Sequence, residues 1–380
     1  MGTPKQLVRI GGRTLLDRTL ANVRAAIGRS NESASIGSVG PGSSLGAVGV
    51  GSVGEIILVL GFAAAELERE VSTEGLKIVM NPAYAEGMAS SLRAGIAAVG
   101  PHARGALIVL ADQPCLRPAT LLRLIEHHRD ARPQIVIPTY RGFRGNPVLL
   151  DRSVFPEIME ISGDVGCRAI FGLHSENISK LDVDDVGILL DVDTGEDLER
   201  LAVACGQEEA AGAVAPLSEL ENRGAVAGEA EASRPELVVV GRDRVAITLM
   251  KLGGLLGFTT TLVDPLLTLK DVPEADRLLH RLDLSMVQVM GNRYIVVASR
   301  GQFDEEALEQ ALQSDAAYVG LVANKKRARE LASSLERKGV PAERLARMRT
   351  SAGLDIGAES PEEIALSIMA EIVGTKSGRS

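Results

Sequence analysis

Short, mostly apolar runs alternate along the chain with segments in which apolar residues recur at helical spacing. The runs occupy residues 56–60, 76–80, 105–111, 134–138, 237–240, 260–263, 294–298 and 318–323. Between them, residues 90–99 and 119–130 have the periodicity of amphipathic helices. Apolar runs of this length that are separated by helices indicate a parallel sheet covered on both faces. The pattern therefore predicts an α/β fold.

Two stretches interrupt this pattern. Residues 29–54 are rich in Gly, Ser and Val and nearly free of charge, which predicts a flexible surface insertion. Residues 207–235 are rich in Glu, Ala and Gly and lack a core pattern, which predicts an interdomain linker. Because the strand pattern restarts after the linker, we expect two α/β domains, at residues 1–206 and 236–376.

Composition and charge narrow the class of protein. The formal net charge of the 380 residues is −9, and no basic stripe interleaved with aromatic residues occurs, which argues against a nucleic-acid partner. The longest apolar runs, such as residues 56–65, are about ten residues long, too short to cross a bilayer of roughly 30 Å. The first residues lack the apolar region of a signal peptide. We therefore expect a soluble, cytoplasmic protein with no membrane partner.

The three cysteines, Cys115, Cys167 and Cys205, are scattered and form no Cys-x-x-Cys pair. This spacing is typical of reduced thiols and not of a disulfide framework or a zinc module.

Polar residues that follow the apolar runs are the candidate site residues, because ligands of open α/β sheets bind at the carboxyl ends of the strands. Asp112 follows one such run, where its carboxylate suits Mg²⁺ or caps the next helix. Gly87 and Ser90 lie at an expected helix start, where they hold a phosphate or simply cap the helix. The glycines in residues 142–148 and 163–166 permit close approach to a ligand or form ordinary turns.

Taken in order, these pieces resemble the molybdenum cofactor nucleotidyltransferases, and the cytidylyltransferase branch in particular. The resemblance covers residues 1 to about 203 apart from the insertion. It rests on the motifs at residues 2–7 (GTPKQL), 11–18 (GGRTLLDR), 81–95 (NPAYAEGMASSLRAG), 111–114 (ADQP), 142–148 (GFRGNPV), 163–166 (GDVG) and 191–198 (DVDTGEDL).

The resemblance implies a reaction and a role for each matching residue. The terminal phosphate of molybdopterin-bound molybdenum would attack the α-phosphate of CTP, or of GTP, and release pyrophosphate, with Mg²⁺ and a Lys neutralising charge. The implied nucleotide contacts are Gly2, Lys5, Asn81, Gly87 and Ser90. Lys5 and Asp112 would be the catalytic residues, and Asp112 and Asp191 would face the metal. The residues implied on the pterin side are Gly145, Pro147 and Asp164. For Asp191, the alternative is a structural role near a helix capped by Asp193 or Thr194.

The sequence departs from the family in two places. Gly145, Asn146 and Pro147 stand where family members usually have Gly-His-Pro. The family also begins with a strand and a glycine-rich loop ending in Arg-Met-Gly, whereas this chain starts at that Met-Gly. Loss of a central strand would leave two rows of backbone groups unpaired. We therefore expect either that the true start lies upstream of Met1, which we favour, or that the domain is degraded.

The second domain begins with the strand, turn, helix and strand of a dinucleotide fold, and Asp264 is placed for a ribose hydroxyl. Its glycine pattern is incomplete, because Gly241 is followed by Arg242 and Asp243. The Asp243 carboxylate opposes an anion at this turn, which argues against NAD binding. Gly241 and Asp264 remain the candidate ligand residues.

Residues 353–372 (GLDIGAESPEEIALSIMAEI), with residues 303–308 and 318–328, resemble the C-terminal domain of the xanthine dehydrogenase accessory proteins, the XdhC and CoxI group. The resemblance covers about residues 234–376 and implies a Rossmann-like domain that binds molybdenum cofactor and helps to insert it into molybdenum hydroxylases. Residues 325–327 (KKR) would hold a pterin phosphate or form a solvated helix face.

The leading hypothesis is a bifunctional maturation protein that completes the molybdenum cofactor and delivers it to a molybdenum hydroxylase. The alternative is a non-catalytic cofactor carrier with a degraded transferase domain.

Overall fold

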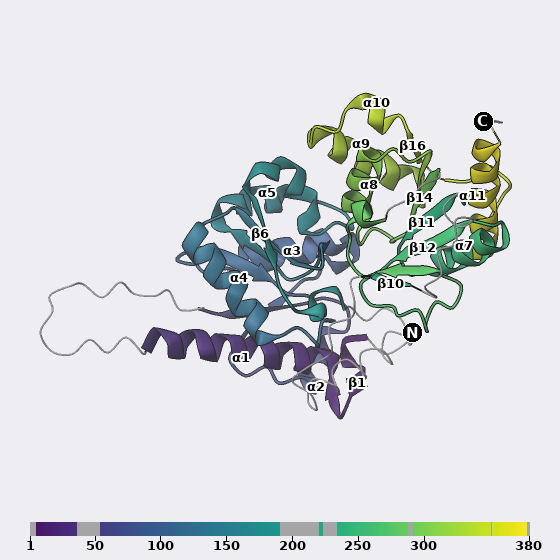
Figure 1. Ribbon diagram of the computed structural model, residues 1–380. Coiled ribbons are helices and arrows are strands. Elements are labelled where there is room, and N and C mark those ends of the chain that lie inside the picture. Colours follow the sequence, from purple (N-terminus) through teal and green to yellow (C-terminus); the bar gives the residue numbers. More distant parts are fainter. Residues whose placement is uncertain are drawn as a thin grey trace, which may run out of the picture. The chain divides into compact units, whose positions relative to one another are not determined.

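The computed structural model describes residues 5–35, 54–190, 220–222, 234–287, 292–350 and 352–377. The chain divides into two compact units, residues 1–140 with 144–214, and residues 215–380 with 141–143. Each unit has an α/β fold, as the sequence pattern predicts (Figure 1).

The helical and strand elements of the first unit follow one another in the order expected from the apolar runs. They are η1 (Lys5–Leu7), β1 (Arg9–Ile10), β2 (Arg13–Thr14), α1 (Leu15–Ser35), β3 (Ile56–Leu60), α2 (Ala64–Glu70), β4 (Leu76–Met80), η2 (Tyr84–Glu86), α3 (Met88–Ala97), β5 (Gly105–Ile108), α4 (Pro118–Ala131), β6 (Ile135–Tyr140), β7 (Phe143–Arg144), β8 (Val148–Asp151), η3 (Arg152–Val154), α5 (Phe155–Glu160), η4 (Cys167–Leu173), η5 (Ser175–Asn177), β9 (Ile178–Asp182) and η6 (Val186–Leu189).

The larger sheet of this unit has the order β5-β8-β6-β7, with β9 also paired to β6. It is mixed and not purely parallel, because β8 runs antiparallel to both β5 and β6. Alternate β6 side chains enter different cores, as expected for a strand buried on both faces. Ile135 and Ile137 pack with residues of α3 and α5, whereas Val136 packs with Leu124 of α4.

The strands β3 and β4 form a separate parallel pair. Among the described residues, β3 pairs only with β4, and β5 pairs only with β8. The apolar side chains of β3 from Ile56 to Val59 are half-buried, whereas those of β6 from Ile135 to Ile137 are buried.

Helix α1 extends to Ser35 and so enters the stretch that composition assigns to the insertion. The sequence between Arg29 and Ser35 contains neither Gly nor Pro, so nothing in it ends the helix. Residues 36–53 of the expected insertion lie outside the described residues.

The second unit contains one sheet with helices on both faces. Its elements are β10 (Leu220–Asn222), β11 (Glu236–Val240), α7 (Arg244–Leu255), β12 (Thr259–Val263), β13 (Arg277–Leu279), η7 (Leu284–Met286), β14 (Arg293–Val297), α8 (Asp304–Gln313), β15 (Tyr318–Leu321), α9 (Lys325–Arg337), α10 (Ala342–Leu345), β16 (Met348–Thr350) and α11 (Pro361–Lys376). Figure 1 shows α7 and α11 side by side, and both pack on Leu237 and Val239 of β11.

The strand order of this sheet is β10-β13-β12-β11-β14-β15-β16. All neighbours from β13 to β16 are parallel, which gives the doubly wound order with its switch point between β11 and β14. The strand β10 lies within residues 207–235 and pairs antiparallel with β13, so that stretch is more than a linker. A strand of only three residues has too little alternation to be recognised in the sequence.

No helix in the described part of the chain is long and apolar enough to cross a membrane.

Candidate functional site

The carboxyl ends of β3 and β4 bring the first group of site residues together. The two strands are in parallel register up to Leu60 and Met80. Asn81 N–H then donates a hydrogen bond to Leu60 O (2.7 Å). The chain therefore leaves both strands at the same edge, where ligands of such sheets bind.

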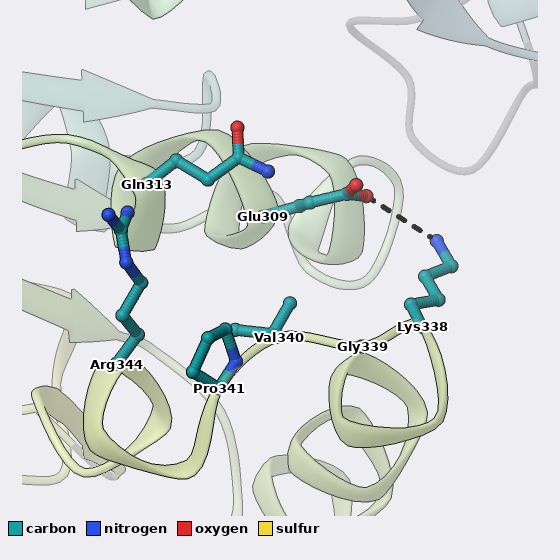
Figure 2. A pocket seen from close by; sticks show the side chains of 7 residues that line it. All are labelled: Glu309, Gln313, Lys338, Gly339, Val340, Pro341 and Arg344. Carbon is teal, nitrogen blue, oxygen red and sulfur yellow. Dashed lines mark ion pairs between the residues drawn. The ribbon is translucent and has the colours of Figure 1, made fainter.

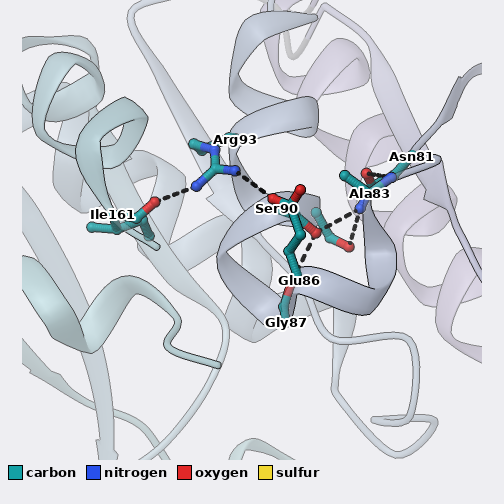
Figure 3. A network of polar contacts seen from close by, with 8 residues as sticks. Asn81, Ala83, Glu86, Gly87, Ser90, Arg93 and Ile161 are labelled. Atoms are coloured by element: carbon teal, nitrogen blue, oxygen red, sulfur yellow. Dashed lines mark hydrogen bonds and ion pairs between the residues drawn. The ribbon is translucent and has the colours of Figure 1, made fainter. Parts of the chain in front are cut away.

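Asn81 and Ser90 are the buried centre of a polar network (Figure 3). Asn81 Nδ2 donates to Ser90 Oγ (2.9 Å) and to Ser91 Oγ (3.0 Å), while Asn81 Oδ1 accepts from Ala83 N (3.0 Å). Ser90 Oγ donates in turn to Gly87 O (2.9 Å). The network thus assembles three of the expected nucleotide residues, and their bonds are to one another. In this arrangement Asn81 and Ser90 hold the loop in shape.

The first turn of α3 lies against the loop that carries Asp164. Met88 N donates to Asp164 Oδ1 (3.3 Å), and Ala89 N donates to Gly163 O (3.1 Å). Gly87 has φ 103°, and a Cβ placed on it would lie 2.6 Å from the backbone of Gly163. Gly87, expected on the nucleotide side, and Asp164, expected on the pterin side, are therefore neighbours.

Arg93 joins this group, although it is not among the expected site residues. Its Nη2 lies 3.4 Å from Glu86 Oε2, and its Nη1 donates to Ile161 O (Figure 3). Glu86 lies in η2 and Arg93 in α3, so the two residues do not share a helix and their spacing in the sequence does not indicate the pair.

Asp112 lies in the loop after β5, and its side chain is half-buried. The helix α4 begins at Pro118 with Arg117 as its N-cap residue, so the alternative that Asp112 caps this helix is wrong. The loop is anchored on α1, since Asn22 Nδ2 donates to Pro114 O (3.0 Å). Asp112 is therefore placed by the fold in the loop that follows β5.

Gln113, next to Asp112, is 1% exposed and donates from Nε2 to Ile188 O (3.2 Å). Its Oε1 is buried and accepts no hydrogen bond from the described residues. The same Ile188 O accepts from Asn146 N (2.9 Å). The turn with Gly145 and Pro147, expected on the pterin side, thus meets the Asp112 loop at Ile188.

For three expected site residues the structure describes no side-chain position. Gly2 and Asp191 lie outside the described residues. Lys5 begins η1, but its side chain is not described.

The turn that follows Gly241 in the second unit is closed by hydrogen bonds within the chain. Gly241 N donates to Val263 O (3.1 Å), which joins the ends of β11 and β12. Asp243 caps α7, accepting from Ala246 N at Oδ1 (2.9 Å) and from Arg300 Nε at Oδ2 (3.0 Å). The positive end of this helix therefore already carries a carboxylate.

Asp264, 1% exposed, is also engaged within the chain. Its Oδ1 accepts from Leu266 N (2.9 Å) and Leu267 N (3.0 Å), and its Oδ2 lies 3.9 Å from Arg242 Nη1. The carboxylate expected for a ribose hydroxyl thus shapes the turn after β12.

We predict that 1 mM NAD⁺ will leave the unfolding midpoint of the chain unchanged in differential scanning fluorimetry. The reason is that Asp243 occupies the place of the pyrophosphate and Asp264 is bonded to backbone N–H groups. A dinucleotide present at 100 times its dissociation constant would stabilise the fold by about 2.7 kcal/mol. A midpoint that rises with NAD⁺ concentration would contradict this prediction.

Two other polar features of the second unit are explained within the chain. Lys325 and Lys326 are exposed at the start of α9, which Asn324 caps by accepting from Arg327 N (2.8 Å). A hollow of about 460 Å³ lies between α8, the residues that follow α9, and α10 (Figure 2). Its Lys338 pairs with Glu309 (3.6 Å), and its Arg344 donates to Leu312 O (3.0 Å). Lys325 and Lys326 thus lie on an exposed helix face, and the hollow includes no expected ligand residue.

Comparison with known families agrees with this two-unit structure. Residues 1–178 match the MobA-like NTP transferase domain, and residues 237–372 match the XdhC Rossmann domain. A relative from Paenarthrobacter nicotinovorans, nicotine blue oxidoreductase, is 33% identical over 156 residues, which are 39% of this chain and 74% of that protein. The chain belongs to the MobA-like NTP transferase family. An XdhC Rossmann domain follows the MobA-like domain.

Two relatives from Escherichia coli K12 show how far these similarities extend. The molybdenum cofactor cytidylyltransferase is 26% identical over 143 residues, which are 37% of this chain and 71% of that protein. The uncharacterized protein YqeB is 31% identical over 150 residues, which are 38% of this chain and 28% of YqeB. The chain thus spans little more than a quarter of the length of YqeB.

The cysteines of the MobA-like domain differ from the expectation of reduced thiols. Cys115 is disulfide-bonded, whereas Cys167 is a free, buried thiol. Burial raises the pKa of Cys167 to about 12, because the thiolate would lose its hydration. Spacing in the sequence misses the disulfide because the chain path, and not the spacing, decides which sulfurs meet.

We predict that neither Cys115 nor Cys167 will react with iodoacetamide in the native, non-reduced chain at pH 8. A pKa of about 12 leaves almost no Cys167 thiolate at that pH, and Cys115 has no thiol to offer. Unfolding in urea with a reductant exposes both to alkylation, which peptide mass spectrometry measures. Alkylation of Cys115 without reductant would contradict the disulfide.

Proposed function

We propose that the MobA-like domain transfers CMP from CTP to the terminal phosphate of molybdenum-loaded molybdopterin. An oxygen of that phosphate forms a bond to the α-phosphorus of CTP, and the bond from this phosphorus to the bridging oxygen breaks, so that pyrophosphate leaves. The observation that carries the proposal is the family match of residues 1–178, joined to the similarity with a protein named molybdenum cofactor cytidylyltransferase. GTP is the alternative nucleotide.

The residues around Asp112 fit a magnesium ion. The Asp112 carboxylate and the buried Oε1 of Gln113, which accepts no hydrogen bond from the described residues, are hard oxygen donors, which Mg²⁺ prefers. Among the described residues no group of three metal-ligating side chains occurs, but Mg²⁺ needs only one or two carboxylates when water and substrate phosphates complete its shell. Asp112, together with Asp191, would hold the ion. Bound Mg²⁺ would neutralise the charge that develops on the phosphates.

The chain's own residues would position the two substrates. The Asn81 network and Gly87 fix the start of α3, beside which the nucleotide would lie with Gly2 and Lys5. Gly145, Pro147 and Asp164 would face the pterin. Holding the attacking oxygen in line with the breaking bond supplies much of the rate, because this reaction needs positioning more than covalent catalysis.

The XdhC Rossmann domain would receive the product and deliver it to a molybdenum hydroxylase of the xanthine dehydrogenase type. Its match to the XdhC family supports this role, and the closed turn at Asp243 argues against a dinucleotide there, although Gly241 and Asp264 stay candidate ligand residues. Two domains on one chain raise the effective concentration of an unstable product at the next site. We place this function in the cytoplasm.

The test of the proposed transfer is pyrophosphate release that requires CTP, Mg²⁺ and molybdenum-loaded molybdopterin together. A non-catalytic carrier would instead bind the cofactor without releasing pyrophosphate.

A second candidate function is an oxidation or reduction of a small molecule, because a 33% identical relative is named nicotine blue oxidoreductase. This function would appear as a change in the absorbance of nicotine blue when it is incubated with the chain and an electron donor. Turnover in this assay, without pyrophosphate release in the other, would favour it.

A further inference from the structure

The only two exposed aromatic side chains of the chain lie together at the carboxyl ends of β3 and β4. All 10 aromatic residues, 6 Phe and 4 Tyr, are within the described residues. Phe62 is 52% exposed and Tyr84 is 45% exposed, while the other aromatic residues are buried or half-buried. Met88, 52% exposed, stands at the start of α3. We call Phe62, Tyr84 and Met88 the aromatic platform.

The backbone holds this pair of aromatic rings in place. The rings of Phe62 and Tyr84 lie 6.2 Å apart at an angle of 62°, a T-shaped contact. A Cβ on Gly61 would lie 2.5 Å from the Cβ of Tyr84, so only glycine lets Tyr84 pack this closely on the chain. Ala63 has φ 55°, a left-handed conformation that is uncommon outside glycine. Exposure of the two rings is therefore built into the fold.

The polar network described above borders the platform. Ala83, next to Tyr84, donates from its N–H to Asn81 Oδ1 (3.0 Å), and Asn81 N donates to Leu60 O (2.7 Å). The aromatic platform is thus tied directly to the loop that holds Gly87 and Ser90. A ligand that fits this surface has a planar ring to stack and a polar part to meet the loop.

We propose that the aromatic platform stacks the base of the nucleotide substrate. This proposal rests on the proposed function, which supplies the nucleotide, and it adds the residues that would bind its ring. Stacking on an aromatic side chain depends little on which base is bound, because every base has a flat aromatic face. Phe62 and Tyr84 would therefore contribute affinity for the nucleotide more than a choice between CTP and GTP.

Isothermal titration calorimetry of the full chain with CTP and with inorganic triphosphate, both in Mg²⁺, tests the platform. We expect Phe62→Ala and Tyr84→Ala each to weaken CTP binding about 5- to 100-fold and to leave triphosphate binding unchanged. Tyr84→Phe keeps the ring and should bind CTP as the wild type does. Met159→Ala, which removes a 43% exposed methionine from α5, is the matched control and should change neither affinity.

The outcomes separate this proposal from the transferase proposal. CTP binding that is equally tight in the wild type and both alanine variants would overturn the platform while leaving the transferase standing. Weakened binding of a soluble pterin, with CTP binding unchanged, would overturn the assignment to the base. Failure of the wild type to bind either CTP or triphosphate would overturn both proposals. Circular dichroism of each variant shows that it is folded.

Discussion

Asp112→Asn will lower the rate of CMP transfer by about 10²- to 10³-fold. The substitution keeps the size of the side chain but removes the negative charge that would hold Mg²⁺, and removal of one electrostatic contact to a transition state commonly costs this much. The melting temperature should change by less than about 2 °C, because Asp112 is half-buried and does not cap α4. Steady-state release of pyrophosphate and a thermal melt measure the two effects.

Asp130→Asn is the matched control for this prediction. Asp130 is an exposed carboxylate at the end of α4, paired with Arg129 (2.8 Å), and this pair lowers its pKa mainly through the side-chain hydrogen bond. Loss of the Asp130 charge should leave the rate of CMP transfer unchanged, since an exposed ion pair contributes little to the stability of the fold. An Asp112→Asn protein that turns over at the wild-type rate would refute the metal assignment.

Gly87→Ala will destabilise the MobA-like domain by about 2 to 4 kcal/mol, the second large effect that we expect. Its φ of 103° disfavours any side chain, and the new Cβ would lie 2.6 Å from the backbone of Gly163. Because backbone atoms cannot move aside as a flexible side chain can, the start of α3 would shift. Proteolysis at increasing urea concentrations measures this loss of stability separately for each domain.

Gly163→Ala separates the cost of a positive φ from the cost of the close approach between Cβ and backbone. Gly163 has φ 82°, but a Cβ there would meet nothing within 4 Å among the described residues. This variant should therefore lose only the conformational cost, about 1 kcal/mol. Equal losses in the two variants would show that the close approach of Gly87 to the Gly163 loop adds nothing.

The apolar runs are enough to predict the α/β fold, but not the pairing within the first sheet. The runs that become β3, β4, β5 and β6 are visible as continuous apolar segments, and each is a strand. Periodicity does not report strand direction, so the antiparallel β8, which separates β5 from β6, is absent from the prediction. The same limit hides β10, whose backbone pairing with β13 depends on where the chain returns.

The candidate site shows the same division between local and distant information. The network of Asn81 and Ser90 is local, and the residue types at residues 81–91 indicate it. The contact between Met88 and Asp164 joins residues 76 positions apart, so only the fold brings them together. A motif can thus name Gly87 and Asp164, but it cannot reveal that they are neighbours.

The most direct test of the account is release of pyrophosphate by the full chain, incubated with molybdenum-loaded molybdopterin, Mg²⁺ and either CTP or GTP. The transferase proposal predicts release with CTP that stops when either the molybdopterin or the Mg²⁺ is omitted, together with a CMP-bearing pterin product in the mass spectrum. Binding of molybdopterin without pyrophosphate release from either nucleotide would contradict it, and would leave a carrier of the cofactor as the function of this chain.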